Sequence, residues 1–430
     1  MTRVLLLATT TGYQTRAFGD AAERLGVDLV FATDRCDQID DPWRDGAIAI
    51  RFHDEDRSVA AIVDSARMRP IDGILVVGDR PAAIGARLAH ALGLPWHPPA
   101  AAAAARNKRL TRERFRAAGL PVPWFLTLPV DHEPSAISHE PLQYPCVVKP
   151  LALSGSRGVM RADDEAGLRT AIERLRALLG SPDVRVERDA AHDALLVEGF
   201  IPGREYAIEG LMHFGRLHRL AIFDKPDPLD GPFFEETIYV TPSRAARELQ
   251  DAMATAIARA ADALGLYHGP IHAECRVAPD GVYVLEVAAR PIGGLCARAL
   301  RFAPGGVALE EVLLRHALGE APDAWTREDE ASGVMMTPIP RRGILRGVSG
   351  LEEAQAVPHI TGVHVTAKAD QLLVPLPEGA SYLGFIFARA ADPTEVEQAL
   401  RSAYRRLDFR IDPDLPVLSA SQMHYNRAHG

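Results

Sequence analysis

The chain has 430 residues, of which 47% are hydrophobic and 24% are charged, and its formal net charge is -9 at pH 7. This length predicts two to three domains, and the acidic balance argues against binding of nucleic acid or a membrane surface through bulk charge. No apolar run approaches the roughly 18 residues that a membrane span requires, and the first residues match no secretory signal. We therefore expect a cytoplasmic protein.

The cysteines give no sign of a covalent framework. Cys36, Cys146, Cys275 and Cys296 are far apart in the chain and form no CxxC pair. Such spacing indicates neither a zinc site nor a set of disulfides, so four reduced thiols are expected.

Apolar runs alternate with helical patterns along the first hundred residues. Runs at 3–8, 27–34 and 71–79 have the character of buried strands, and helical patterns follow the first and the last of them. This alternation predicts a parallel sheet with crossover helices. No GxGxxG follows the first strand, so the dinucleotide-binding fingerprint is absent and an NAD-dependent oxidoreductase is disfavoured.

Later segments predict further strands and helices. Residues 98–123 have prolines at both ends and are expected to form one helix at a domain boundary. Strands are expected at 145–150, 193–201 and 205–212, and helices at 163–180, 247–264 and 392–407. Two strands flank Asp280-Gly281, a turn that predicts a hairpin, and the charged segment 321–333 is expected to be a linker.

Lysine is rare in this chain. Only four of the 48 basic residues are lysines, and they are Lys108, Lys149, Lys225 and Lys368. Arginine is a wide planar fork and lysine a compact point charge, so a retained lysine is a candidate for a site where a fork does not fit. Lys149 precedes the loop SGSRG at 154–158, and a Ser/Gly loop allows main-chain N–H groups to approach phosphate oxygens closely.

Acidic residues complete the pattern. Glu198 and Glu205 lie on either side of a predicted turn, and Glu274 and Glu286 lie on the two arms of the predicted hairpin. Carboxylates on adjacent antiparallel strands can reach one metal ion, and Mg²⁺ prefers one or two carboxylates plus phosphate oxygens. Arg290 would add a fixed positive charge beside the reacting group. The order of these features predicts a site for a nucleoside triphosphate.

This order of motifs resembles the ATP-grasp superfamily, whose members clamp ATP between two α+β subdomains and make acyl phosphates. Two segments, FDKPDPLDGPFFEETIYVTPS (223–243) and LVPLPEGASYLGFIFARA (373–390), are similar to the L-amino acid ligase group. The resemblance implies a fold of α/β and α+β parts. These are a Rossmann-like pre-domain at 1–103, an ATP-grasp domain at 104–325 with a lid at about 140–205, and a C-terminal α+β domain at 326–430.

The resemblance also implies residue roles. ATP would be bound by two lysines, the lid loop and a hinge, namely Lys108, Lys149, Ser154, Gly155, Ser156, Gly158, Glu198, Phe200, Ile201 and Glu205. Mg²⁺, with Mn²⁺ as an alternative, would be held by Glu274 and Glu286, and the catalytic cations would be Arg290 and Lys225. The substrates would be bound by Glu236, Tyr239, His272, Gly293 and Gly294.

One position departs from the family pattern. Ala288 stands between Glu286 and Arg290 where the superfamily commonly has asparagine, so one ligand oxygen is missing and the number of metal ions stays open.

The implied activity is that of an ATP-dependent ligase. It would join a carboxylate, such as an L-amino acid, to an amine, such as a second amino acid, through an acyl phosphate, with ADP and phosphate as products. Two alternatives stay open: a biotin-carboxylase-like or purine-pathway enzyme that uses bicarbonate or formate, and an inactive nucleotide-binding scaffold. The expected partners are small molecules, without nucleic acid or membrane, and a homodimer is common among similar ligases.

Overall fold

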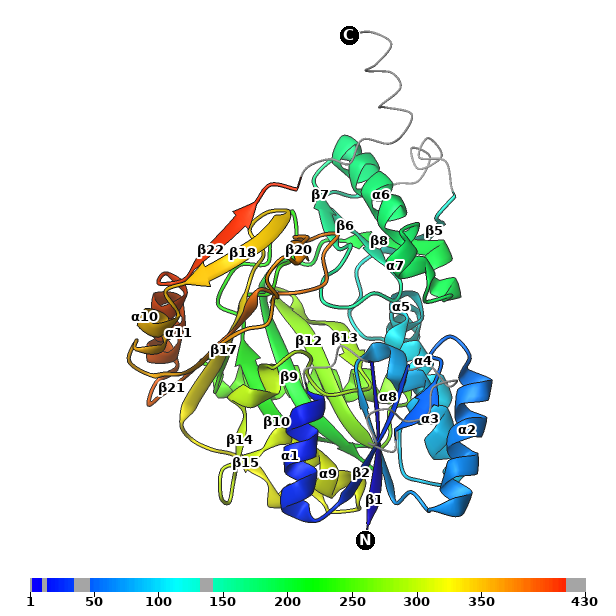
Figure 1. Ribbon diagram of the computed structural model, residues 1–430. Helices are drawn as coiled ribbons and strands as arrows, with labels where there is room; N and C mark the ends of the chain where they lie inside the picture. Colours follow the sequence, from blue (N-terminus) through cyan, green and yellow to red (C-terminus); the bar gives the residue numbers. More distant parts are fainter. Residues whose placement is uncertain (1, 10–13, 35–46, 132–141, 415–430) are drawn as a thin grey trace, which may run out of the picture.

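The computed structural model describes residues 2–9, 14–34, 47–131 and 142–414 (Figure 1). It confirms a fold of α/β and α+β parts, with a parallel sheet near the N-terminus and antiparallel sheets elsewhere. Cys36 lies outside these ranges, and Cys146, Cys275 and Cys296 are buried free thiols. None of the helices in these ranges has both the length and the apolar character that crossing a membrane requires.

The N-terminal sheet has the predicted Rossmann-like arrangement, with four parallel strands in the order β3-β2-β1-β4. Its elements are β1 (Arg3–Ala8), α1 (Thr15–Leu25), β2 (Asp28–Asp34), β3 (Ile48–Ile50), α2 (Glu55–Met68), β4 (Gly73–Val77) and α3 (Asp79–Leu92). Every residue of β1 and β4 is buried, as expected where helices cover both faces of a parallel sheet. Helix α3 begins at Asp79, directly after the carboxyl end of β4.

The single helix predicted over 98–123 is wrong, because two helices occupy this segment. They are α4 (Pro99–Arg106) and α5 (Lys108–Ala117). Asn107 between them has an extended backbone, with φ -105° and ψ 110°, and its side-chain oxygen accepts hydrogen bonds from the N–H groups of Arg109 and Leu110. Asparagine is a strong N-cap, so it starts a new helix here. The break places Lys108 at the first position of α5, where its ammonium donates to the carbonyl oxygen of Leu153 at 2.7 Å.

The segment predicted as the lid, about 140–205, forms a four-stranded antiparallel sheet together with β5, in the order β5-β8-β6-β7 and covered by α6, at the top of Figure 1; its role as a lid stays a prediction. Its elements are β5 (Phe125–Pro129), β6 (Cys146–Pro150), β7 (Met160–Ala162), α6 (Glu165–Leu179), α7 (Pro182–Arg185) and β8 (Ala194–Gly199). The side chain of Asp164 caps α6 by accepting from the N–H of Gly167. The apolar stripe of the helix, including Leu168, Ile172 and Leu175, packs on the sheet.

An eight-stranded sheet in the order β13-β12-β9-β10-β11-β17-β21-β19 runs through the molecule. Its strands are β9 (Arg204–His213), β10 (Arg216–Asp224), β11 (Ile238–Thr241), β12 (Gly269–Ala278), β13 (Gly281–Ala288), β17 (Ala331–Thr337), β19 (Ile360–Val365) and β21 (Gly384–Ala390). The predicted hairpin at Asp280-Gly281 is confirmed, and it places Glu274 directly opposite Glu286. Because β11 pairs with β17, the sheet continues across the predicted domain boundary at 325. The division of the chain at 103 and 325 stays a prediction.

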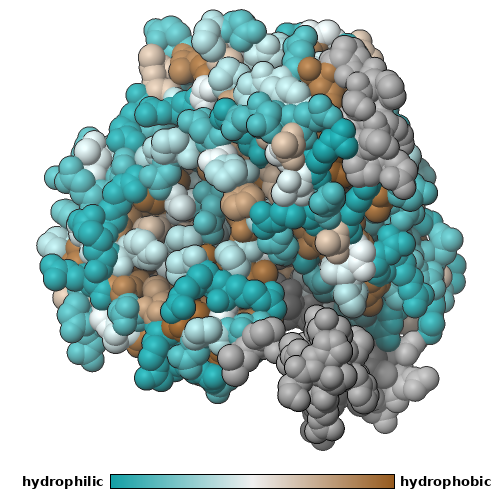
Figure 2. All heavy atoms as spheres, turned by 90° about the horizontal axis from the view of Figure 1, so that it is seen from above, coloured by the Kyte–Doolittle hydropathy of each residue, from teal (hydrophilic) through white to brown (hydrophobic). Residues whose placement is uncertain are grey.

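Helices cover the large sheet, and two small sheets complete the fold. The helices are α8 (Arg247–Leu264), α9 (Leu309–Ala317), α10 (Leu351–Gln355) and α11 (Pro393–Tyr404). The small sheets have the orders β15-β14-β16 and β20-β18-β22, with strands β14 (Arg301–Ala303), β15 (Val307–Ala308), β16 (Thr326–Arg327), β18 (Gly343–Ser349), β20 (Leu372–Leu373) and β22 (Asp408–Asp412). The segment 321–333, expected to be a linker, therefore contributes β16 and the start of β17. On the face shown in Figure 2, apolar residues lie scattered among hydrophilic ones.

Candidate active site

A cavity of about 650 Å³ is lined by residues of the N-terminal domain, the lid and the large sheet. This volume lies within the usual range of small-molecule sites. Of the residues predicted from the sequence to form the site, all except Lys225 and Gly158 line this cavity. Residues near the start of β21, Ala380, Ser381, Tyr382 and Phe385, add a wall from the C-terminal part of the chain.

Lys225 lies behind the cavity wall, surrounded by carboxylates. Its ammonium donates to Glu205 and Glu274 at 2.7 Å each, and it also contacts Glu236. Burial alone would lower the pKa of Lys225, but the three carboxylates raise it well above its usual value. Lys225 is therefore a fixed counter-ion for the acidic residues, and its role toward phosphate stays a prediction.

Two of the three carboxylates around Lys225, those of Glu236 and Glu274, are held in different protonation states. Burial and repulsion from Glu274 raise the pKa of Glu236 to about 7. Although burial would raise the pKa of Glu274 as well, Lys225 and His272 hold it well below its usual value. The Tyr239 hydroxyl donates to Glu236 at 2.8 Å, and its oxygen lies 3.2 Å from Glu274. Glu274 is thus ionised at neutral pH, whereas Glu236 exchanges a proton near neutrality.

His272 lies between two carboxylates, the buried Glu209 and the partly buried Glu274. Its Nδ1 is 3.0 Å from Glu209, and its Nε2 is 3.8 Å from Glu274. Burial opposes the charged imidazolium, but both carboxylates favour it and raise the pKa of His272 to about 9. Glu209 also accepts from the main-chain N–H of Ile292 at 3.1 Å, which fixes the segment that leads to Gly293 and Gly294.

Glu198 is shared by two cations. Arg112, 1% exposed, donates to it from Nε at 2.7 Å and from a terminal nitrogen at 3.1 Å, and Lys149 contacts the same carboxylate. Burial would raise the pKa of Glu198, but Arg112 and Lys149 lower it to about 2. Burial lowers the pKa of Lys149 to about 8 despite the carboxylate. The Glu198 side chain therefore positions Lys149, and a contact with adenine would have to come from the main chain of this hinge.

Arg290 is held by a residue of the N-terminal domain. It donates to both oxygens of Asp79, at 2.8 Å and 3.1 Å. Burial works against the charges of both groups, but their pairing raises the pKa of Arg290 and lowers that of Asp79. Because Asp79 is the first residue of α3, the N-terminal domain fixes the orientation of Arg290 at the cavity wall.

The predicted lid loop lies against the C-terminal part of the chain. Gly158 donates its N–H to the carbonyl oxygen of Pro377, and Arg157 donates to that of Glu378, each at 2.8 Å. Gly158 has φ +75°, and an added Cβ would lie 2.8 Å from Leu175 of α6. Gly158 therefore serves to pack the loop on its helix, whereas Ser154, Gly155 and Ser156 line the cavity.

Two carboxylates of the cavity fit a divalent metal ion. Glu274 and Glu286 lie opposite each other on β12 and β13 and both line the cavity. Residues directly opposite on antiparallel strands project to the same face of the sheet, and paired carboxylates suit Mg²⁺. Ala288 lies opposite His272 and adds no oxygen ligand.

Comparisons with known proteins agree with this geometry. The family models that match are the ATP-grasp N-terminal domain over residues 19–96, the ATP-grasp domain over 142–299 and the L-amino acid ligase C-terminal domain 2 over 335–412. The chain belongs to the ATP-grasp superfamily. Within it, the C-terminal model associates the chain with the carboxylate–amine ligases of the L-amino acid ligase group, as the two segments noted in the sequence indicated.

Solved structures and curated relatives of this ATP-grasp chain point the same way. It superposes on the crystal structure of L-amino acid ligase from Bacillus licheniformis with a TM-score of 0.80 and 27% identity, over 96% of this chain and 99% of that one. Carnosine synthase 1 of Homo sapiens is 27% identical over 85% of this chain and 45% of its own length. An uncharacterized protein of Sinorhizobium fredii is 25% identical over 74% of this chain and 64% of its own. The chain thus spans less than two thirds of these curated relatives.

A more distant structure shares only the fold. Phosphoribosylglycinamide synthetase from Anaerococcus prevotii is 15% identical, with a TM-score of 0.65.

Several residues of this ATP-grasp site were missed at the sequence level. Arg112 pairs with Glu198, Asp79 pairs with Arg290, and Glu209 pairs with His272. Arg276 donates to Glu205 at 2.9 Å and to the carbonyl oxygen of Ile201 at 2.8 Å, so it fixes both ends of the hinge. Arg276 lies two residues after Glu274 on the same strand, and this spacing places both on one face; that signal was available in the sequence.

Proposed function

We propose that the chain is an ATP-dependent ligase that joins the carboxylate of one amino acid to the amino group of another. The observation that carries the proposal is the make-up of the cavity wall. Lys108, Lys149 and Arg290 supply positive charge, and Glu274 and Glu286 line the same cavity, where they would serve as metal ligands. The similarity of residues 335–412 to an L-amino acid ligase domain supports amino acids as substrates.

In the proposed reaction, the γ-phosphoryl group of ATP moves to the substrate carboxylate, with ADP as the leaving group. The neutral amine then attacks the carbonyl carbon of the acyl phosphate, the amide bond forms, phosphate leaves with the bonding electrons of the broken C–O bond, and the proton lost by the amine ends on the released phosphate. Lys108 and Lys149 would neutralise phosphate charge, and Arg290 would stabilise the oxyanion that develops during attack. Mg²⁺ held by Glu274 and Glu286 would neutralise further charge on the phosphates.

The substrate end of the cavity has its own chemistry. Glu236, whose pKa burial and Glu274 raise to about 7, would in its ionised form attract the ammonium group of the amino acid that is activated. Tyr239 orients this carboxylate by donating to it. Gly293 and Gly294 leave room beside it, because neither has a side chain to fill the pocket. The loop at 154–158 would limit the access of water, which would otherwise hydrolyse an acyl phosphate.

A matrix of amino acid pairs tests the proposal. Purified chain is incubated with ATP, Mg²⁺ and each pair, and phosphate release and the mass of the product are measured. We expect phosphate release that depends on a specific pair, with a product equal to the two amino acids minus water. Glu286→Gln is the matched inactive control, because it removes one metal ligand while keeping the shape of the side chain, and we expect at least about a hundredfold loss of rate. Arg290→Ala is expected to lose the activity too.

Other outcomes would assign another function. Release stimulated only by bicarbonate or formate would indicate an enzyme of the biotin-carboxylase or purine type. Binding of ATP with Mg²⁺ but no release with any pair would indicate an inactive scaffold. Wild-type turnover in Arg290→Ala would remove that residue from the mechanism.

A further inference from the structure

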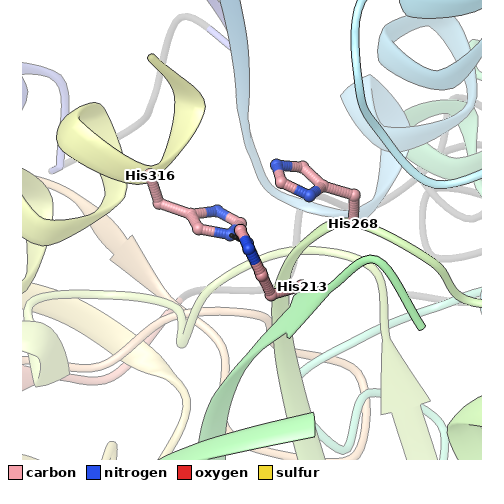
Figure 3. A group of neighbouring side chains, drawn as sticks. All are labelled: His213, His268 and His316. Atoms are coloured by element: carbon pink, nitrogen blue, oxygen red, sulfur yellow. Dashed lines mark hydrogen bonds between the residues drawn. The ribbon is translucent and has the colours of Figure 1, made fainter. Parts of the chain in front are cut away.

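Five of the 15 histidines gather at one place in the fold, away from the cavity. They are His97, His213, His218, His268 and His316. His213, His268 and His316 lie closest together and are called the histidine cluster below (Figure 3). His213 ends β9, His268 directly precedes β12, and His316 lies in the last turn of α9, so three separate segments meet here.

The spacing of the histidine cluster approaches that of a metal site. One ring nitrogen from each residue lies within 4.8 Å of the others, and Nδ1 of His213 is 3.2 Å from Nε2 of His316. Nitrogen ligands at about 2.1 Å from a tetrahedral Zn²⁺ are separated by about 3.4 Å. One pair is therefore at ligand spacing already, and the third nitrogen reaches it by a small rotation of a side chain.

One buried ring nitrogen of the histidine cluster lacks a hydrogen-bond partner in the described part of the chain. His268 is 2% exposed, and its buried Nδ1 has no hydrogen-bond partner among the residues that the structure describes. Buried polar atoms are nearly always paired, so an unpartnered imidazole nitrogen points to a missing ligand.

We propose that His213, His268 and His316 bind one divalent transition metal ion, with Zn²⁺ as the best fit. Three imidazoles and a water molecule make a common zinc coordination sphere. His213 is half-buried, and the exposed rings of Phe214 and Tyr267 lie at the same corner, so the ion reaches the cluster from the surface. The bound ion would tie α9 to the ends of β9 and β12.

This site is separate from the carboxylates of the cavity. His268 precedes Glu274 by six residues along an extended strand, a distance of roughly 20 Å. The ligands also differ, because imidazole favours Zn²⁺ whereas carboxylates favour Mg²⁺. The inference does not depend on the proposed ligase activity.

Binding of Zn²⁺ to the full-length chain, without a histidine tag, tests the proposal. The chain is stripped with a chelator, and Zn²⁺ is titrated in excess Mg²⁺, which occupies the carboxylates of the cavity. We expect one Zn²⁺ per chain and a rise in Tm on its addition. In His213→Ala and His316→Ala the affinity falls at least about tenfold and the rise in Tm is lost. His53→Ala, which removes an exposed histidine, is the matched control and behaves as wild type.

Two results would overturn the proposal. One is that Zn²⁺ does not bind to the wild-type chain under these conditions. The other is equal affinity in wild type and His213→Ala, which would place the ion elsewhere and leave the three rings as a metal-free packed cluster. His213 is the least buried of the three, so its variant decides the matter if His316→Ala fails to fold.

Discussion

Glu198 shows how one buried carboxylate holds two cations in place. Arg112 binds both of its oxygens from inside the protein, and Lys149 reaches it from the cavity side. Without this carboxylate, two positive charges would face each other in a region shielded from water. The pair Arg112–Glu198 therefore serves as the fixed support on which Lys149 is positioned, and the predicted contact of Glu198 with a nucleotide stays a prediction.

The first prediction concerns the stability of this support. Glu198→Gln leaves Arg112 and Lys149 buried without a counter-ion, so we expect a loss of about 3–5 kcal/mol in the free energy of unfolding. Urea denaturation measures it. Glu113→Gln removes an exposed ion pair with Arg109 and is expected to cost less than about 1 kcal/mol. Equal losses in the two variants would show that Glu198 does not hold the two cations.

The second prediction concerns the pH dependence of ATP binding. The pKa of Lys149 is lowered to about 8, so this side chain is a cation below that pH and becomes neutral above it. We expect the affinity for ATP to fall as the pH rises through about 8, as measured by calorimetry. Lys149→Arg should bind ATP more weakly at pH 7, since the fork does not fit, but its affinity should stay flat because arginine remains charged. A parallel decline in both proteins would assign the titration to another group.

At the scale of elements, the lid is connected to the C-terminal part of the chain. Arg174 of α6 donates to both oxygens of Glu378, at 2.8 Å and 3.0 Å, while Arg157 of the loop donates to the main chain of the same residue. Residues just after Glu378 line the cavity. The segment from Glu378 to Tyr382 thus connects the predicted lid to the wall of the cavity.

The third prediction tests this link. Glu378→Gln removes the charge that holds Arg174 but keeps the main-chain contacts. Both side chains are about 40% exposed, so the pair contributes less than about 1 kcal/mol. The rate of phosphate release without the amine can therefore change by at most about fivefold. We expect more phosphate release in the absence of the amine substrate, because a looser lid admits water. Glu395→Gln, at an exposed position of α11, is the control, and an unchanged ratio of uncoupled to coupled release in Glu378→Gln would contradict the link.

Local signals explain which elements were predictable. The Asp280-Gly281 turn and its flanking strands predicted the hairpin that carries Glu274 and Glu286, but the register shift between Glu274 and Cys275, which brings the two glutamates directly opposite each other, has no signal in the turn. The break at Asn107 was missed because good helix formers lie on both sides, although asparagine before a charged helical run is itself a capping signal. The partners of Glu198 and Arg290 could not be predicted in this way. Arg112 lies 86 residues from Glu198 in the chain, and Asp79 lies 211 residues from Arg290. No local sequence pattern encodes such a distant pair.

At the scale of the whole molecule, the continuous sheet joins the site to the C-terminal core. Ile238 and Val240 of β11 pack into the hydrophobic core formed with β17, β21 and α11. Tyr239 between them points to the opposite face and lines the cavity, as the alternation of a strand requires. Strand β11 therefore contributes side chains both to the C-terminal core and to the wall of the cavity. The sequence around 321–333 has the composition of a linker, and only the pairing of β11 with β17, far apart in the chain, reveals the continuity.

The last prediction tests whether the pairing of β11 with β17 supports both the C-terminal core and the cavity. Gly333 of β17 lies opposite Val240, and an added Cβ would lie 2.8 Å from the carbonyl oxygen of Tyr239 and 2.7 Å from a methyl group of Val396 on α11. Gly333→Ala is therefore expected to cost about 1–3 kcal/mol in the free energy of unfolding and to raise KM for the amino acid substrate, because Tyr239 shifts. Gly347→Ala on β18 is the matched control, since no atom of the described part of the chain lies within 4 Å of its added Cβ and the entropic effect of the substitution is the same. The prediction is wrong if the two variants unfold at the same denaturant concentration and keep the same KM. In that case the β11–β17 pairing tolerates the added methyl group, and the C-terminal part of the chain does not shape the site through β11.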